Sequence, residues 1–244
     1  MEETKVEHFI TCNGTKIWTD ICGNRKKGYI ILCNGGPGSC DYLKPVSEMM
    51  EDGYQVIRFE QRGCGRSDAD GKYDLDTAIQ DIEAIRVYYG IERWIVGGHS
   101  WGANLALIYA MRYPEHTEAV LYIAGNGLQR NREWSALYHA NREKYGEEMP
   151  DMQYPANDEV NKQGNRCYQE FIQQPSLYKD IAGLKMKILF LCAKQDIRPD
   201  WPARQLCSLV RNGEIAFIEG AGHYMWLQNP TDMRSALRRF LKVD

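Results

Sequence analysis

The pentapeptide Gly98-His99-Ser100-Trp101-Gly102 constrains the fold of this chain more than any other segment. It directly follows an apolar run over residues 94–96 and precedes an apolar helical pattern over residues 105–111. A G-x-S-x-G sequence between a strand and a helix is typical of a nucleophile elbow, in which glycines permit a sharp turn that exposes the serine hydroxyl. An ordinary strand–helix turn with a capping serine is the alternative. The strand before and the helix after favour Ser100 as a nucleophile.

Short apolar runs alternate with helical patterns along most of the chain. The runs have the length and composition of strands. They cover residues 15–21, 29–33, 55–59, 94–96, 119–123, 188–192 and 215–218. Apolar residues recur at helical spacing between them, over residues 75–90, 105–111, 202–210 and a last segment that ends at Phe240. This alternation predicts an α/β fold, with a mostly parallel sheet and helices on both faces.

The alternation breaks near Gly125. Residues 127–180 contain no strand-like apolar run, but they do contain two helical stripes. We therefore expect a short helical cap insertion over residues 127–180, within a sheet-forming core that spans residues 1–126 and 181–244. The insertion should arch over the strand end that carries Ser100. Aromatic stripes are often only helix-packing faces, but Trp134 and Tyr138 could also form an apolar roof over a substrate.

His223 is the candidate base for the serine. It ends the loop Gly220-Ala221-Gly222-His223, between the last strand and the last helix, where an imidazole can be aimed at the strand ends. A neutral imidazole would accept the serine proton. Activity should therefore rise as the histidine loses its own proton, near the ordinary pKa of about 6.5. We expect a neighbouring carboxylate to raise that pKa.

Asp196 is the candidate partner of the imidazole. It follows the apolar run over residues 188–192, so it should lie at the same edge of the sheet as Ser100. A carboxylate there would hold the tautomer of the histidine and stabilise its positive charge. Asp200 is the alternative, but it directly precedes Trp201-Pro202 and is better placed as a helix N-cap.

The loop Asn34-Gly35-Gly36-Pro37-Gly38 follows a strand expected beside the nucleophile strand. Its bend can direct the backbone N–H of Gly36 inward. The N–H of Trp101, directly after the nucleophile, would be a second donor. Two such donors would stabilise the oxyanion of an acyl transfer. An ordinary Gly-Pro turn is the alternative, and the oxyanion hole is favoured because it completes the set.

Composition and charge argue against several classes of protein. The 244 residues include 30 Lys and Arg against 33 Asp and Glu, a formal charge of −3, so there is no basic field for nucleic acid. No apolar stretch approaches the roughly 18 residues of a membrane helix, and no secretion signal is apparent, so we expect a cytoplasmic protein without membrane contact. The eight cysteines are scattered, and no phosphate loop or metal-ligand cluster occurs. We expect reduced thiols, no metal and no cofactor.

Four motifs carry a resemblance to a known family. They are Asn-Gly-Gly-Pro-Gly at 34–38, Glu-Gln-Arg-Gly-Cys-Gly-Arg-Ser at 60–67, Gly-Gly-His-Ser-Trp-Gly at 97–102 and Gly-Ala-Gly-His at 220–223. Together they resemble the α/β-hydrolase superfamily, and most closely its proline iminopeptidase family. The resemblance implies an α/β-hydrolase fold with an eight-stranded sheet, a helical cap, no cofactor and release of an N-terminal proline. The implied catalytic triad is Ser100, Asp196 and His223, and the implied oxyanion donors are Gly36 and Trp101.

The chain also departs from that family. Asn34 stands where histidine is usual and Glu60 where aspartate is usual, and we expect these to alter loop hydrogen bonds rather than the chemistry. The insertion is short. Those peptidases hold the substrate's amino group with carboxylates of the cap, and Glu133 and Glu143 are only loose counterparts.

These features predict a cofactor-free serine hydrolase that forms an acyl-enzyme with a small-molecule or short-peptide substrate. Two forms of that activity stay open, release of N-terminal proline and hydrolysis of small carboxylic esters. An amine-binding enzyme needs an acidic anchor in the insertion, whereas a neutral ester does not. The alternative function is a catalytically weak ligand-binding or sensor protein on the same fold. The sequence does not predict the oligomeric state.

Overall fold

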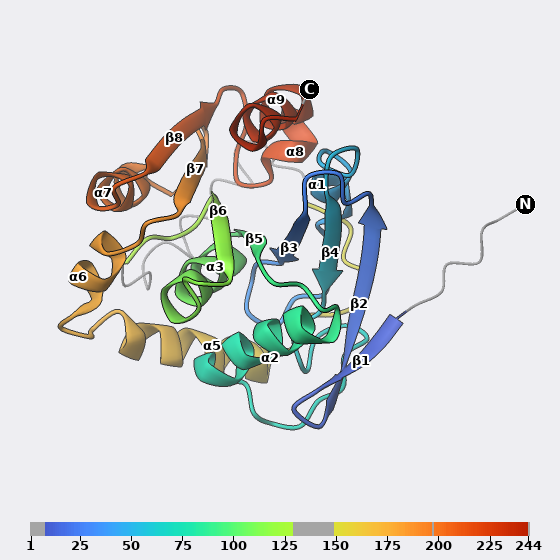
Figure 1. Ribbon diagram of the computed structural model, residues 1–244. Coiled ribbons are helices and arrows are strands. Elements are labelled where there is room, and N and C mark those ends of the chain that lie inside the picture. Colours follow the sequence, from blue (N-terminus) through green and yellow to red (C-terminus); the bar gives the residue numbers. More distant parts are fainter. Residues whose placement is uncertain (1–7, 129–148, 197, 244) are drawn as a thin grey trace, which may run out of the picture.

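Eight strands form one sheet in the computed structural model, which describes residues 8–128, 149–196 and 198–243 (Figure 1). The strands are β1 (His8–Cys12), β2 (Thr15–Gly23), β3 (Tyr29–Cys33), β4 (Gln55–Phe59), β5 (Trp94–His99), β6 (Thr117–Ile123), β7 (Lys187–Ala193) and β8 (Gly213–Ile218). Their order across the sheet is β1-β2-β4-β3-β5-β6-β7-β8. Only the β1–β2 and β2–β4 pairs are antiparallel and the other five pairs are parallel, so the predicted mostly parallel sheet of eight strands is confirmed.

Helices cover both faces of this sheet. They are α1 (Lys44–Ser47), α2 (Leu75–Tyr88), α3 (Trp101–Arg112), α5 (Asp158–Phe171), α6 (Leu177–Ala182), α7 (Trp201–Leu209), α8 (Met225–Gln228) and α9 (Pro230–Leu241). Figure 1 shows α2 and α3 on one side of the sheet and α8 and α9 on the other. The predicted helices on both faces are therefore confirmed.

The side chains of β7 illustrate how one strand serves both layers. Successive side chains of a strand point to opposite faces. Ile188 and Phe190 accordingly pack into the core shared with α2 and α3, whereas Leu189 and Leu191 pack into the core shared with α9. All four are fully buried. A strand buried on both faces needs a continuous apolar run, which is why residues 188–192 contain no polar position.

Two glycines let α3 pass directly against the sheet. A Cβ at Gly102 would lie 1.9 Å from the carbonyl oxygen of Cys33, and one at Gly98 would lie 2.0 Å from the oxygen of Gly102. No side chain fits at either position. The contact brings the first turn of α3 against the end of β3.

Two described helices lie between β6 and β7, in the region where the sequence predicts an insertion. The side chain of Asn157 caps α5 by accepting hydrogen bonds from the N–H groups of Glu159 and Val160. α6 follows α5 and ends shortly before β7. In the part of the chain that the structure describes, no helix is both long and apolar enough to cross a membrane.

We predict that Gly102→Ala severely destabilises the fold, because its methyl group would collide with backbone rather than with a flexible side chain. The free energy of unfolding in urea should fall by about 3 kcal/mol or more. Gly183→Ala is the matched control, since a Cβ there comes no closer than 3.3 Å to another atom. Equal stability of the two variants would contradict the close approach of α3 to β3.

Candidate active site

The carboxyl ends of the parallel strands bring the three predicted catalytic residues to one edge of the sheet. Ser100 directly follows β5, Asp196 comes three residues after β7, and His223 comes five residues after β8. Ligands of open α/β sheets bind outside these strand ends. Residues separated by more than a hundred positions in the sequence therefore share one location.

Ser100 has the backbone conformation of a sharp turn. Its φ is 57° and its ψ is −116°, backbone angles that residues other than glycine rarely adopt. The turn is held by the N–H of Ser100, which donates to the carbonyl of Ile123 at 2.8 Å, and by its carbonyl, which accepts from Ala103 at 3.1 Å. Strain of this kind costs on the order of 1–3 kcal/mol and persists only where the surroundings enforce it.

Asp196 and His223 form a buried pair. The Nδ1 atom of His223 lies 2.8 Å from Oδ2 of Asp196, and their side chains are 2% and 7% exposed. The second carboxylate oxygen accepts from the backbone N–H of Arg198 at 3.0 Å. Burial alone would raise the pKa of Asp196, but the charge and hydrogen bond of His223, together with Arg198, lower it below its usual value. Asp196 is therefore ionised at neutral pH and accepts the Nδ1 hydrogen of the imidazole.

Asp200, the alternative acid, has another partner. It occupies the N-cap position of α7, but its side chain makes no capping hydrogen bond. Instead its carboxylate pairs with Arg204 at 2.9 Å on the surface. The geometry therefore favours Asp196 as the partner of His223.

Arg198 is a site residue that the sequence analysis missed. Its Nη1 atom donates to Oγ of Ser100 at 3.1 Å, and it lies 2.7 Å from Nε2 and 3.1 Å from Nδ1 of His223. An atom placed at the Nε2 lone pair, in the plane of the ring, would be much farther from Nδ1. The guanidinium therefore lies over the face of the imidazole. A cation two residues after the candidate acid was the signal available in the sequence.

The pKa of His223 is shifted in the direction opposite to the one expected. Burial lowers it below 6.5, the charge of Arg198 lowers it further, and Asp196 raises it by less than these two effects combined. The expectation of a raised pKa was wrong because it counted the carboxylate but neither the burial nor the arginine. His223 is therefore neutral at pH 7, as a general base must be.

The loop after β3 lies against Ser100. A Cβ at Gly35 would lie 2.8 Å from Cβ of Ser100, so the loop backbone passes directly beside the serine. Gly36 has a φ of 50°, which suits glycine. Trp101 is the first residue of α3, and the first N–H groups of a helix have no acceptor within the helix. The loop that carries Gly36 and the first turn of α3 thus both lie beside Ser100.

The two departures from the family pattern are both fixed by hydrogen bonds. The side-chain amide of Asn34 donates to the carbonyls of Ser39 and Cys40, at 2.7 and 3.2 Å. The carboxylate of Glu60 pairs with Arg66 at 2.8 Å and accepts from the N–H of Asp41 at 3.1 Å. Both residues therefore hold loops near the site.

A chain of hydrogen bonds links the loop after β3 to the backbone of His223. The N–H of Gly35 donates to the hydroxyl of Tyr42 at 2.7 Å, and that hydroxyl lies 2.8 Å from Nδ1 of His99. Nε2 of His99 lies 3.0 Å from the carbonyl oxygen of His223. A carbonyl can only accept, so Nε2 of His99 carries the hydrogen and Nδ1 accepts from Tyr42. One buried histidine thus joins the loop after β3 to the loop that carries His223.

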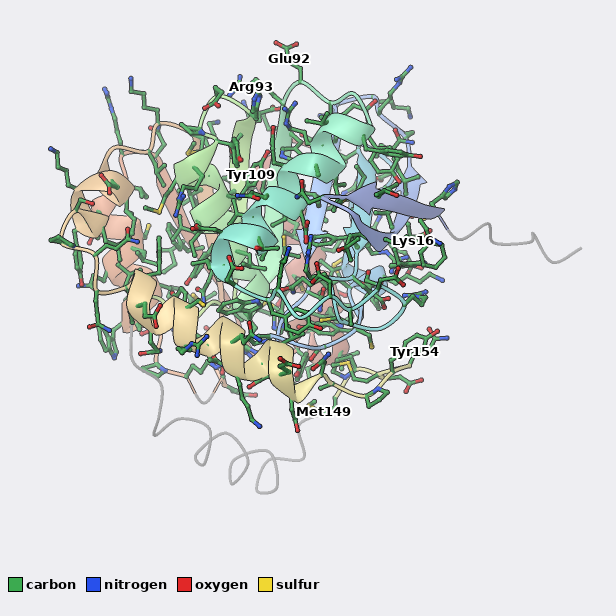
Figure 2. All side chains as sticks on the ribbon, turned by 90° about the horizontal axis from the view of Figure 1, so that it is seen from below. Lys16, Glu92, Arg93, Tyr109, Met149 and Tyr154 are labelled. Atoms are coloured by element: carbon green, nitrogen blue, oxygen red, sulfur yellow. The ribbon has the colours of Figure 1, made fainter. Side chains whose placement is uncertain are left out.

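α5 covers the same end of the sheet. Glu92 and Arg93, just before β5, lie at one end of the molecule in Figure 2, and α5 lies at the opposite end. The side chain of Asn161 donates to the carbonyl of Pro37 at 2.8 Å. Tyr168 meets Trp101 edge to face, with ring centroids 5.6 Å apart. α5 is therefore packed on both the loop after β3 and the first turn of α3, which lie beside Ser100.

Four predicted substrate-binding residues, Glu133, Trp134, Tyr138 and Glu143, lie outside the residues that the structure describes. Within the described residues, no three His, Cys, Asp or Glu side chains are grouped so that they could hold a metal ion. All eight cysteines are described, and none is in a disulfide.

Comparison with known proteins decides the family. The family model described as alpha/beta hydrolase fold matches residues 28–164. The chain belongs to the α/β hydrolase family. It is 36% identical over 138 residues to a proline iminopeptidase of Xylella fastidiosa (strain 9a5c), a match that covers 54% of this chain and 43% of that protein. The chain thus spans less than half the length of this relative. The predicted resemblance to proline iminopeptidases is confirmed at the level of sequence.

Solved structures share the α/β hydrolase fold over nearly the whole chain. An esterase from Exiguobacterium antarcticum has a TM-score of 0.79 at 19% identity, with 97% of this chain and 100% of that chain covered. A proline iminopeptidase from Mycobacterium smegmatis has a TM-score of 0.72 at 16% identity, with 97% and 98% covered. Identities this low establish the shared fold alone.

The burial of His99 predicts a loss of stability in acid. Burial, and then the nearby charge of His223, hold the pKa of His99 well below 6.5. Below pH 6.5, His99 is therefore protonated in the unfolded chain but stays neutral in the folded chain. Stability is full above that pH and falls as the pH drops toward the folded-state pKa, by about 1.4 kcal/mol for each unit of lowering.

Urea unfolding at several pH values between 5 and 7.5 measures this effect. His99→Gln keeps a donor and an acceptor but cannot titrate, so its stability should depend less on pH than that of the wild type. Identical slopes for the two proteins would show that His99 is not the group responsible.

Proposed function

We propose that the protein is a serine hydrolase that cleaves small carboxylic esters through an acyl-enzyme. One observation carries this proposal: the buried pair of Asp196 and His223 lies beside a serine held at positive φ. Ser100 and His223 share the guanidinium of Arg198 as a contact, so both lie within one small site. Membership of the α/β hydrolase family supports the same class of activity.

In the proposed mechanism, Oγ of Ser100 attacks the acyl carbonyl and Nε2 of His223 takes the serine proton. Asp196 accepts the Nδ1 hydrogen, which fixes the tautomer and stabilises the imidazolium. The proton then passes to the leaving alkoxide, and the acyl group stays on the serine. Water, activated by the same imidazole, releases the acid and restores the enzyme.

The backbone N–H groups of Gly36 and Trp101 would stabilise the oxyanion of both tetrahedral intermediates. Their supports are the loop that lies beside Ser100 and the first turn of α3. Donors fixed before the reaction need no rearrangement as charge develops, and the loss of one costs roughly 3 kcal/mol in the barrier.

Arg198 favours an ester over a peptide with an N-terminal proline. The amine of such a peptide is bonded to the carbon beside the scissile carbonyl, so it would enter the site that holds the guanidinium. Two unit charges 4 Å apart repel by about 4 kcal/mol at an effective dielectric constant of about 20. Similarity to proline iminopeptidases supports the peptidase as the second candidate.

We propose further that residues 127–180 form a cap over a core of residues 1–126 and 181–244. α5 supports this division, because it packs on Pro37 and Trp101. Substrate choice would reside in the cap, where Trp134 and Tyr138 would supply an apolar roof. Eight unpaired thiols agree with a reducing compartment, and we propose the cytoplasm.

Ser100→Ala should abolish turnover and leave the fold intact. Loss of a triad nucleophile commonly lowers kcat by about a millionfold. Steady-state hydrolysis of 4-nitrophenyl acetate measures this, and labelling by a fluorophosphonate identifies the reactive residue. A sensor with weak activity would release one equivalent of nitrophenol and stall, whereas the proposed enzyme turns over many times. Normal turnover by Ser100→Ala would refute the assignment.

Parallel assays of short acyl esters and proline amides separate the two forms of the activity. We expect turnover of the esters and little of the amides. If the amides are hydrolysed, Glu133→Gln or Glu143→Gln should lower their kcat/KM much more than that of the esters, because a desolvated ammonium needs a paired charge. Efficient hydrolysis of proline amides would overturn the preference for esters.

A further inference from the structure

We propose that Arg198 selects substrates that carry a carboxylate, so that the preferred substrates are small anionic esters. This inference rests on the proposed hydrolase function, and it names the chemical class of the substrate. It follows from the contacts of one guanidinium with the nucleophile and the base.

Three elements hold Arg198 in place. Its backbone N–H donates to Asp196, and its Nη1 atom donates to Ser100 and, at 3.4 Å, to the carbonyl of Ala124. Ala124 follows β6 and has a φ of 47°, an uncommon value for alanine. Its own N–H donates to Leu191 at 2.8 Å, which anchors this strained turn to β7. The guanidinium is thus held in place by residues that follow β5, β6 and β7.

A cation in this position opposes the proposed chemistry of an uncharged substrate. The imidazole must become imidazolium as it takes the serine proton, and Nη1 of Arg198 lies 2.7 Å from its Nε2. A second positive charge so close disfavours the imidazolium. A negative group of the substrate, paired with Arg198, would offset that repulsion when the proton moves. Anionic substrates should therefore gain in the transition state as well as in binding.

A carboxylate matches the chemistry of this group. A guanidinium presents parallel N–H donors that fit the two oxygens of a carboxylate. One guanidinium balances one charge, which suits a monocarboxylate better than a phosphate monoester with nearly two charges. Other groups that face the His223 ring are Asp196, His99 and Tyr224. His99 is held neutral by burial, so it adds no second cation.

Matched substrate pairs test the proposal. 4-Acetoxybenzoate and its methyl ester differ by one charge in the leaving group. The mono-4-nitrophenyl ester of adipic acid and its methyl ester differ by one charge in the acyl group. The wild type should prefer the anionic member of at least one pair. Arg198→Met should lower kcat/KM for that member by about 10- to 100-fold and raise kcat/KM for the neutral member, because the repulsion between Arg198 and the imidazolium is removed.

Arg204→Met is the matched control, because it removes the same charge from an exposed arginine of α7 that pairs with Asp200. It should leave the anionic preference unchanged. Arg198→Lys keeps the positive charge but not the parallel N–H donors of the guanidinium, so it should retain part of the preference for the anionic substrate. The acid limb of kcat/KM for the neutral ester should lie below pH 6.5 in the wild type and move upward in Arg198→Met, because Arg198 lowers the pKa of His223.

The possible outcomes distinguish the two proposals. Turnover of neutral esters with no preference for either anionic substrate would overturn the role of Arg198 and leave the hydrolase standing. An equal loss for both members of a pair in Arg198→Met would also overturn it, since it would indicate an oxyanion contact or a structural role. Absence of any ester turnover, together with absence of fluorophosphonate labelling at Ser100, would refute the hydrolase itself.

Discussion

The passage of α3 directly across the end of β3 is the constraint on which the site depends. Gly98 and Gly102 allow backbone to meet backbone there, with no side chain between them. The tight crossing leaves Ser100 at the apex of the turn, with a positive φ that a serine adopts only when the surrounding structure enforces it. Packing against the sheet on one side and α3 on the other enforces this conformation. The stability of the core thus sustains the strain at Ser100.

Buried polar contacts then tie the loops of the site to one another. Tyr42 and His99 connect the loop after β3 to the loop that carries His223. Both side chains are buried, and each polar atom in the chain of contacts has a partner. A buried polar network destabilises the fold when one of its groups lacks a partner, and it favours a single arrangement of the loops when every group is hydrogen-bonded. The relative position of the loop after β3 and His223 is therefore set by hydrogen bonds as well as by packing.

The sequence predicted those parts of the protein that local patterns determine. Strands buried on both faces are recognisable in the sequence as apolar runs. Residues that follow such runs lie close together because the carboxyl ends of parallel strands meet at the same edge of the sheet. β1 (His8–Cys12) gave no such signal, because its exposed side chains interrupt the pattern. Arg198 and the direction of the His223 pKa shift were missed for another reason. Both depend on the turn at Ala124 and on burial, which arise only when distant strands pair.

The thiols near the strand ends have a consequence for covalent chemistry at this site. Cys33 ends β3 with no exposed surface, and Cys192 lies near the end of β7. Burial raises the pKa of Cys192 to about 12, so its thiol stays protonated at pH 7. An electrophile that enters here meets sulfur in its unreactive, protonated form. Burial and protonation would therefore both protect these thiols from alkylating or acylating reagents, and we expect the hydroxyl of Ser100, beside a neutral imidazole, to react first.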